Sequence, residues 1–119
     1  MKNILVTGGA GYIGSFMVKR LLDEGFAVSV LDSLERGHKE AVDRRASFYI
    51  GNLLDKYFLQ NIFSIGKFDA VIHFAGLISV GESMKNPDEY FRNNTFGTFF
   101  LIEKMREYKV ENIIFSSTA

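Results

Sequence analysis

The chain has 119 residues, of which 47% are hydrophobic and 24% charged, so it can form one domain with a buried core. Its 14 lysines and arginines balance its 14 aspartates and glutamates, and no basic stripe or polybasic run indicates a nucleic-acid or membrane-surface partner. The absence of cysteine excludes disulfides and thiolate metal sites, no apolar run reaches the ~20 residues of a membrane helix, and a cytoplasmic protein without a metal site is expected.

The first predicted element is a strand at Asn3–Thr7, and it leads directly into the glycines Gly8, Gly11 and Gly14. An apolar-periodic helix follows over Tyr12–Glu24. Glycine permits a tight turn and lets the backbone approach a ligand closely. A helix N-terminus offers unpaired N–H groups and a positive dipole end to phosphates. This order of elements predicts a pyrophosphate site.

The second predicted strand, Ala27–Leu31, is followed by Asp32. An acidic residue about 20 positions after the glycines is where a dinucleotide site binds the ribose hydroxyls. Each feature alone fits an ordinary tight turn, but strand, glycines, helix, strand and acid together favour a dinucleotide. Arg36 is compatible with a 2′-phosphate, yet the carboxylate of Asp32 would repel that phosphate, so NAD is favoured over NADP.

Further short apolar strands are predicted at Ser47–Ile50, Ala70–Phe74 and Asn112–Ser117, and helices at Leu53–Phe63 and from Pro87 to about Tyr108. Strands that alternate with helices predict an α/β fold with a doubly wound parallel sheet and right-handed crossovers. Ligands in such folds bind beyond the carboxyl ends of the strands, where the loops over residues 33–40 and 75–86 are expected. His73, within one of the strands, is interpreted as a hydrogen-bonded core histidine.

The last predicted helix contains apolar residues on more than one side. At 100° per residue, the face expected to pack on the sheet contains Phe91, Thr95, Thr98, Ile102 and Met105. Phe96 and Phe100 fall on the opposite face among charged residues, and Gly97 inside the helix indicates close packing. Two exposed phenylalanines and an unprotected last strand predict self-association through this helix, through the strand edge, or through both.

The sequence resembles the extended short-chain dehydrogenase/reductase superfamily and, within it, the UDP-glucose 4-epimerase family. The resemblance covers the whole chain and depends on the segments TGGAGYIGS, VLDSL, VIHFAG, VGESMKNP, NNTFGT and IIFSSTA. It implies a Rossmann-like NAD-binding domain over residues 1–119. It also implies a UDP-sugar substrate and pairing of subunits through the helix that begins at Pro87.

The resemblance also implies roles for individual residues. Gly8, Gly11 and Gly14 form the turn, and the backbone N–H groups of Tyr12 and Ile13 bind the pyrophosphate. The implied adenosine contacts are Asp32, Ser33, Arg36 and Gly37 at the ribose, with Asn52 and Leu53 at the adenine. The implied contacts toward the nicotinamide are Phe74, Ala75, Gly76 and Ile78, with Asn93 and Ser116 on the far side. Thr118 matches the catalytic hydroxyl that hydrogen-bonds the sugar 4-oxygen.

Two positions depart from the family pattern. Asn52 stands where the family usually has aspartate, and its carbonyl oxygen can still accept from the adenine amino group. Ile78 stands where some relatives carry lysine near the cofactor phosphates, so a strong electrostatic hold is not expected there. The family's catalytic Tyr-x-x-x-Lys pair is expected beyond Thr118, so the chain is interpreted as an N-terminal piece, truncated after about five strands.

The chemistry implied by the resemblance is a reversible hydride transfer that interconverts UDP-glucose and UDP-galactose through a transient 4-keto sugar. Without the Tyr-x-x-x-Lys pair, this chain alone is expected to be inactive, because a positioned acid or base typically contributes about 10²–10⁴-fold in rate. Two alternatives stay open. The first is the NAD-binding portion of another sugar-nucleotide enzyme, a 4,6-dehydratase or decarboxylase, and the second is a non-catalytic NAD-binding or interaction domain.

Overall fold

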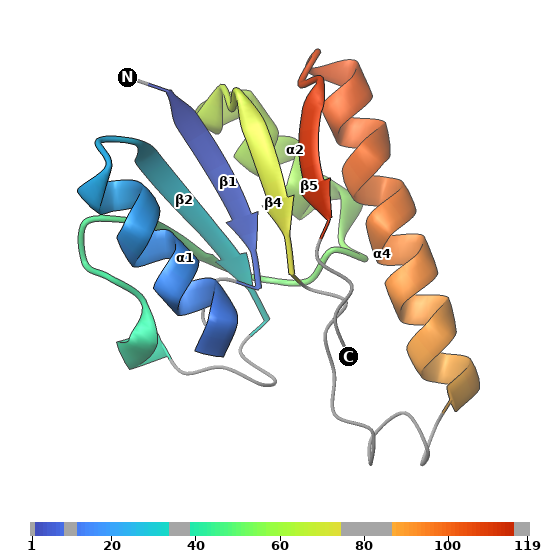
Figure 1. Cartoon of the computed structure of the whole chain (residues 1–119). Helices are drawn as coiled ribbons and strands as arrows, with labels where there is room; N and C mark the ends of the chain where they lie inside the picture. Colours follow the sequence, from blue (N-terminus) through green and yellow to red (C-terminus); the bar gives the residue numbers. More distant parts are fainter. Residues whose placement is uncertain (1, 9–11, 34–38, 75–86, 116–119) are drawn as a thin grey trace.

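The computed structural model describes residues 2–8, 12–33, 39–74 and 87–115 (Figure 1). For Tyr12, residues 87–91, Asn93 and Asn94, only the backbone is described. The elements follow in the order β1 (Asn3–Thr7), α1 (Tyr12–Asp23), β2 (Ala27–Asp32), the 3-10 helix η1 (Lys39–Ala41), β3 (Ser47–Ile50), α2 (Lys56–Gly66), β4 (Ala70–His73), α4 (Pro87–Glu107) and β5 (Asn112–Phe115).

The described strands form one parallel sheet in the order β3-β2-β1-β4-β5. The chain builds outward from β1 to β3 and then crosses back, so that β4 pairs with the other side of β1. This topology confirms the predicted doubly wound sheet. All carboxyl ends lie at one edge, and the strand order reverses between β1 and β4, where folds of this kind bind their ligands.

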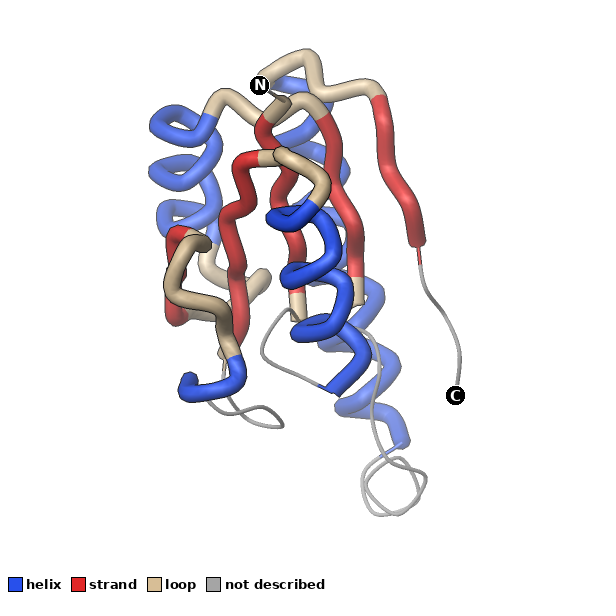
Figure 2. Tube along the Cα trace, turned by 60° about the vertical axis from the view of Figure 1, so that its left-hand side comes forward, coloured by secondary structure: helices blue, strands red, loops and turns tan. Residues whose placement is uncertain are grey.

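Helices cover both faces of the sheet, with α1 on one face and α2 and α4 on the other (Figure 2). Alternate residues of β1 serve the two layers: Leu5 packs toward α2 and α4, whereas Ile4 and Val6 pack toward α1. The central strands are therefore buried on both sides, which explains their continuous apolar sequence. The layer under α2 and α4 includes Leu31, Leu59, Ile62, Phe63, Val71, Leu101 and Met105, and the layer under α1 includes Val18, Val28, Val30, Ile72 and Phe74.

Helix α1 ends as the sequence predicts, at a glycine. Gly25 has φ +96° and donates its N–H to Leu22 O at 3.1 Å, and Phe26 donates to Leu21 O at 3.0 Å. These two bonds form a Schellman motif, which requires a left-handed residue that glycine adopts without strain. The turn directs the chain from α1 into β2.

Helix α2 begins and ends later than predicted, at Lys56 and Gly66 instead of Leu53 and Phe63. Asp55 caps the helix, because its Oδ1 accepts from the backbone N–H of Phe58 at 3.1 Å. Residues before Asp55 form a turn in which Asn52 Oδ1 accepts from Leu54 N at 3.0 Å. Local side-chain-to-backbone bonds of this kind compete with helix formation, so the apolar pattern at Leu53 did not mark the helix start.

The predicted buried face of α4 is wrong by about a quarter of a turn. Gly97, Leu101 and Lys104 are buried, whereas Thr95 and Ile102 are exposed. Met105 is buried as predicted, and the side chain of Phe91 lies outside the described residues. Of the two phenylalanines predicted to face solvent, Phe96 is 48% exposed but Phe100 packs against the core. Apolar residues occur all around α4, so its periodicity does not single out one face. Neither α4 nor any other described helix is apolar over a sufficient length to cross a membrane.

Strand β5 forms one edge of the sheet, and all four of its residues are exposed. It spans Asn112–Phe115 and pairs with β4, with Ile114 opposite Ile72 and Phe115 opposite His73. The predicted unprotected last strand is confirmed for the described residues, and Ser116 and Ser117, predicted as part of this strand, lie outside them. Its apolar side chains have a neighbouring strand on only one side.

Candidate functional site

The carboxyl edge of the sheet brings together the ends of β1, β2 and β4 and the start of α1. Gly8 follows β1 with φ +76°, a left-handed conformation that favours glycine, and donates its N–H to Leu31 O at 2.8 Å. The chain then enters α1 at Tyr12, so the positive end of the helix dipole lies at this edge. Gly14 in the first turn is buried, as expected for a glycine that permits close helix–strand packing. This geometry can bind a pyrophosphate; Gly11 lies outside the described residues.

Asp32 is the last residue of β2, and only 9% of it is exposed. Its backbone carbonyl accepts from Gly51 N at 3.1 Å, which ties the end of β2 to the loop after β3. A buried acid at the carboxyl end of the strand beside the glycine turn is where a dinucleotide ribose binds. Ser33, which follows it, is exposed, and Arg36 and Gly37 lie outside the described residues.

Two residues predicted at the adenine lie in the loop between β3 and α2. Asn52 is exposed, and its Oδ1 already accepts from the backbone N–H of Leu54. The second lone pair of this oxygen could still accept from an adenine amino group. The side chain of Leu53 is 8% exposed and belongs to the core under α2 and α4. Leu53 therefore has a packing role in the structure, and contact of this loop with adenine stays a prediction.

On the nicotinamide side, the structure describes Phe74 but not the residues that follow it. The Phe74 side chain is 6% exposed and packs in the core under α1. Its N–H donates to Thr7 O at 2.8 Å and to Thr7 Oγ1 at 3.1 Å, which fixes the start of the loop after β4. The other residues predicted here, Ala75, Gly76, Ile78, Ser116 and Thr118, lie outside the described residues, and Asn93 is described as backbone alone in α4.

A hydrogen-bonded histidine joins three elements at this edge. His73 is 1% exposed, with Nδ1 at 2.5 Å from Thr7 Oγ1 and Nε2 at 3.0 Å from Thr98 Oγ1. Burial lowers the pKa of His73 to about 4, so the ring is neutral at pH 7. The interpretation of His73 as a satisfied core histidine is confirmed. Its link to α4 through Thr98 was missed, because residues distant in sequence supply the two hydroxyls.

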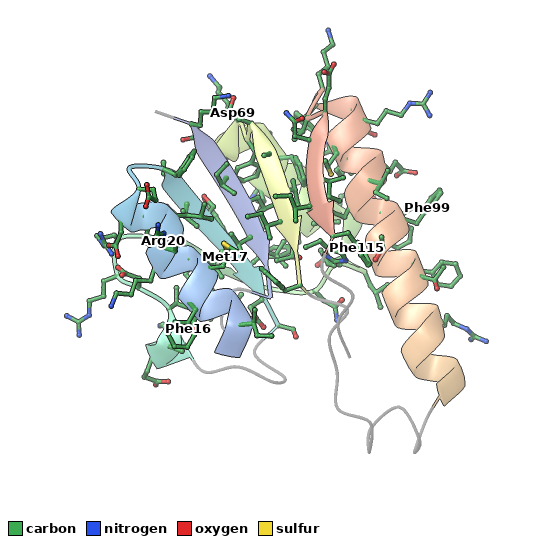
Figure 3. All side chains as sticks on the ribbon, viewed as in Figure 1. Phe16, Met17, Arg20, Asp69, Phe99 and Phe115 are labelled. Atoms are coloured by element: carbon green, nitrogen blue, oxygen red, sulfur yellow. The ribbon has the colours of Figure 1, made fainter. Side chains whose placement is uncertain are left out.

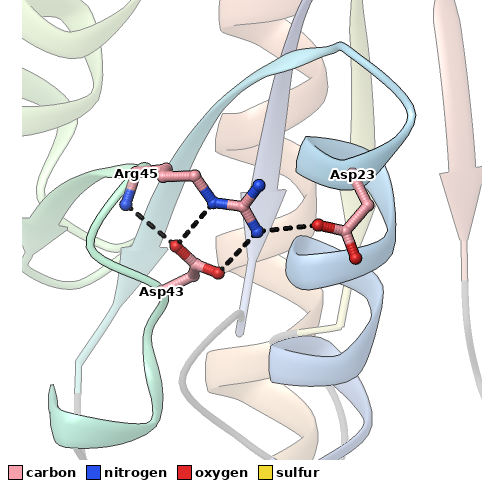
Figure 4. A network of polar contacts seen from close by, with 3 residues as sticks. All are labelled: Asp23, Asp43 and Arg45. Carbon is pink, nitrogen blue, oxygen red and sulfur yellow. Dashed lines mark hydrogen bonds and ion pairs between the residues drawn. The ribbon is translucent and has the colours of Figure 1, made fainter.

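The segment between η1 and β3 is attached to α1 by an exposed ion-pair network (Figure 4). Arg45 contacts both oxygens of Asp43, through Nε at 3.1 Å and Nη2 at 2.9 Å, and its Nη2 also lies 2.9 Å from Asp23 Oδ1. The side-chain and backbone hydrogen bonds from Arg45 lower the pKa of Asp43 to about 2. A shallow groove of about 330 Å³ lies between α1 and this segment, lined in part by Ser15, Phe16, Lys19 and residues 40–44.

The described residues contain no group of three His, Cys, Asp or Glu side chains that could hold a metal ion. Their polar groups at the carboxyl edge include backbone N–H groups, the buried carboxylate of Asp32, threonine hydroxyls and the neutral imidazole of His73. Backbone N–H groups at a helix start suit phosphates, and a carboxylate suits ribose hydroxyls. The donor set therefore fits a dinucleotide.

Known proteins resemble this chain in sequence and in structure. The chain is 53% identical over 116 residues to UDP-glucose 4-epimerase of Lacticaseibacillus casei, a match that covers 98% of this chain and 35% of that protein. The UDP-glucose 4-epimerase of Thermotoga maritima, solved with UDP-glucose, superposes with a TM-score of 0.93 at 41% identity over 98% of this chain and 38% of that one. The Brucella ovis enzyme, solved with NAD, superposes with a TM-score of 0.91 at 44% identity, and the match covers 98% of this chain and 36% of that one.

The chain thus spans little more than a third of the length of these relatives. The similarity nevertheless covers nearly all of its own residues. A family model for the NAD dependent epimerase/dehydratase family matches residues 4–119. Because this match extends over nearly the whole chain, the chain belongs to the NAD dependent epimerase/dehydratase family.

Proposed function

We propose that this chain is the NAD-binding portion of a UDP-glucose 4-epimerase. The observation that carries the proposal is the buried Asp32 at the end of β2, beside the Gly8 turn and the N-terminus of α1. Relatives of 53% identity bear the name UDP-glucose 4-epimerase, and a structural neighbour was solved with NAD. The names of these relatives favour the epimerase over a 4,6-dehydratase, a decarboxylase or a non-catalytic domain.

Each part of the site has a distinct task in this proposal. The first backbone N–H groups of α1 bind the pyrophosphate, and the Asp32 carboxylate accepts hydrogen bonds from the adenosine ribose. The bound cofactor supplies the hydride acceptor and donor for carbon 4 of the sugar. Phe74 and the loop after it border the nicotinamide side, and the Thr118 hydroxyl hydrogen-bonds the sugar 4-oxygen.

The proton transfer needs a base that this stretch of sequence does not supply. No Tyr-x-x-x-Lys spacing occurs in the 119 residues. We therefore propose that these residues bind the cofactor but do not interconvert UDP-glucose and UDP-galactose on their own. The UDP-sugar is a partner of the whole enzyme, and a cytoplasmic location stays a prediction from the sequence.

Self-association is a further part of the proposal. The outer side of α4 exposes apolar side chains that belong to no packed layer, including Phe99 at 59% and Ile102 at 50%. Phe99 points away from the sheet, and Phe115 lies at the end of β5 near α4 (Figure 3). Exposed apolar patches beside an open strand edge favour contact between copies.

Calorimetric titration with NAD and NADP tests the cofactor assignment. We expect NAD to bind more tightly than NADP, because a 2′-phosphate would lie against the Asp32 carboxylate. Asp32→Asn removes the charge and should lower the affinity for NAD about tenfold, as the loss of a charge-assisted hydrogen bond does. It should also reduce the preference for NAD over NADP. Glu111→Gln removes an exposed carboxylate just before β5, at the amino ends of the strands. It is the matched control and should bind both nucleotides as the wild type does. NADP binding equal to NAD binding in the wild type would contradict the assignment.

A further inference from the structure

Two neighbouring residues of α4, Gly97 and Thr98, contact both halves of the carboxyl edge. Gly97 is buried, and a Cβ built on it would lie 3.1 Å from the Cβ of Leu53 in the loop after β3. The Thr98 hydroxyl lies 3.0 Å from Nε2 of His73, the last residue of β4. Strands β3 and β4 stand on opposite sides of β1 in the sheet. One turn of α4 therefore contacts the segments that flank the site on either side.

The contact at Gly97 depends on the absence of a side chain. A Cβ–Cβ distance of 3.1 Å is shorter than ordinary van der Waals contact, so any larger residue would displace Leu53 or the helix. Leu53 cannot move freely, because it is buried in the core and follows Asn52 in a hydrogen-bonded turn. Gly97 thereby sets how closely α4 approaches the loop after β3.

The contact at Thr98 depends on a chain of hydrogen bonds through His73. The backbone N–H of Phe74 donates to Thr7 Oγ1 at 3.1 Å, and the same oxygen lies 2.5 Å from His73 Nδ1. The tautomer with its proton on Nε2 lets the Thr7 hydroxyl donate to Nδ1 and lets Nε2–H donate to Thr98 Oγ1. In this tautomer both ring nitrogens have a hydrogen-bond partner, and burial lowers the pKa of His73, which keeps the ring neutral. Thr98 is thereby tied to the backbone at the start of the loop after β4.

We propose that Gly97 and Thr98 are positioning residues for the dinucleotide, Gly97 acting on the adenine side through Leu53 and Thr98 on the nicotinamide side through His73. This inference rests on the proposed NAD-binding function. It assigns different halves of the same ligand to adjacent residues of one helix. The two residues should therefore be separable with ligands that contain only part of NAD.

The experiment titrates the chain and its variants with AMP, ADP-ribose and NAD by calorimetry. Thr98→Val removes the hydroxyl and keeps the side-chain volume. We expect it to lower the affinity for NAD about five- to tenfold, the effect of one lost hydrogen bond, and to leave the affinity for AMP unchanged. Thr98→Ser keeps the hydroxyl and should restore the wild-type affinity. Thr95→Val, on the exposed side of the same helix, is the matched control and should bind all three ligands normally.

Gly97→Leu tests the other contact. We expect it to lower the affinities for AMP, ADP-ribose and NAD alike by about tenfold, because it displaces Leu53 and with it the loop that contacts the adenine in the proposal. Thr95→Leu adds the same side chain on the exposed side and should have no effect. Circular dichroism of each variant verifies that it is folded, and a Gly97→Leu chain that does not fold is replaced by Gly97→Ala, for which a smaller loss of the same kind is expected.

The histidine ring provides a readout that needs no nucleotide. Nitrogen NMR should show His73 protonated at Nε2, and Thr98→Val should shift that signal while Thr95→Val leaves it in place. Thr98→Val weakening AMP as strongly as NAD, or a His73 signal insensitive to Thr98→Val, would overturn the inference. If the wild type binds NAD and both Thr98→Val and Gly97→Leu bind it equally well, the inference is also overturned. A wild-type chain that binds none of the three ligands instead overturns the proposed function and, with it, the assignment of Gly97 and Thr98 to the dinucleotide.

Discussion

His73 shows how a single buried residue links the stability of this chain to pH. The imidazole has both nitrogens within hydrogen-bonding distance of threonine hydroxyls and is almost completely buried. Protonation would place a charge in the core, and burial disfavours the charged form of the ring. The pKa therefore falls from 6.5 to about 4. Asp32, another buried polar residue at this edge, has a ligand-binding role in the proposal.

We expect the free energy of unfolding to decrease as the pH falls from about 6.5 to about 4. In this window the unfolded chain binds a proton at His73 and the folded chain does not, so acid favours the unfolded state. The slope from this residue should approach, at most, about 1.4 kcal/mol per pH unit. Urea unfolding at a series of pH values from 7.5 to 4.5 measures it.

The variant His73→Asn separates this contribution from those of other groups. It should be less stable than the wild type at pH 7, because it loses the hydrogen bonds and leaves space in the core. Its pH dependence between 6.5 and 4.5 should be shallower. An unchanged slope in this variant would show that other residues, and not His73, cause the acid sensitivity.

At the scale of elements, the contact between α2 and α4 depends on a buried lysine. Lys104 is 6% exposed, and its Nζ lies 3.2 Å from Gln60 Oε1 on α2 and 3.1 Å from Glu107 Oε2 one turn along α4. The methylene groups of the side chain fill the space between the helices, while the ammonium group is hydrogen-bonded. The lysine thus contributes packing and polar contacts together.

Truncation of Lys104 should destabilise the fold more than loss of its charge alone. Lys104→Ala removes both contributions, and we expect it to lower the free energy of unfolding by about 1–3 kcal/mol. Lys104→Met keeps most of the apolar stem and should lower it less. Arg106→Ala, an exposed cation on the same helix, is the control and should change stability little. Urea unfolding compares the three variants, and equal losses for Lys104→Ala and Arg106→Ala would contradict this account.

The whole molecule is covered by helices on both faces of the sheet but exposes apolar side chains along one side. This side includes the outer face of α4, with Phe96, Phe99 and Ile102, and the edge strand β5, where Ile114 is 64% exposed. The central strands β1 and β4 have paired neighbours on both sides, whereas β5 pairs only with β4. Exposed apolar side chains also occur on α1, α2 and β3, but on this side those of α4 lie beside those of an open strand edge.

We expect the chain to self-associate at micromolar concentrations through this side. A Phe99→Glu, Ile102→Glu double variant should shift it toward the monomer, because each carboxylate would be buried without a partner in the contact. Phe100 is unsuitable for this test, since it packs against the core and its replacement would destabilise the fold. Sedimentation velocity over a range of concentrations measures the distribution.

An Arg92→Glu, Arg106→Glu double variant is the control, because it changes the charge of exposed positions on α4 without removing apolar area. If association persists unchanged in the Phe99→Glu, Ile102→Glu variant, the strand edge and not α4 would be the contact. A wild type that is monomeric at high micromolar concentration would refute the prediction altogether.

Local signals in the sequence determined the elements and their order. The glycines after β1, Gly25 after α1 and the apolar strands all act through backbone conformation or two-sided burial, which neighbouring residues reveal. The parallel sheet and the position of Asp32 at its carboxyl edge follow from that order. The tertiary structure alone decided which side of α4 is buried, because Leu53 and α2 select the face that carries Gly97 and Leu101. It also decided the bonds of His73, since Thr7 and Thr98 lie 66 and 25 residues away and meet it only through the pairing of β1 with β4 and the packing of α4.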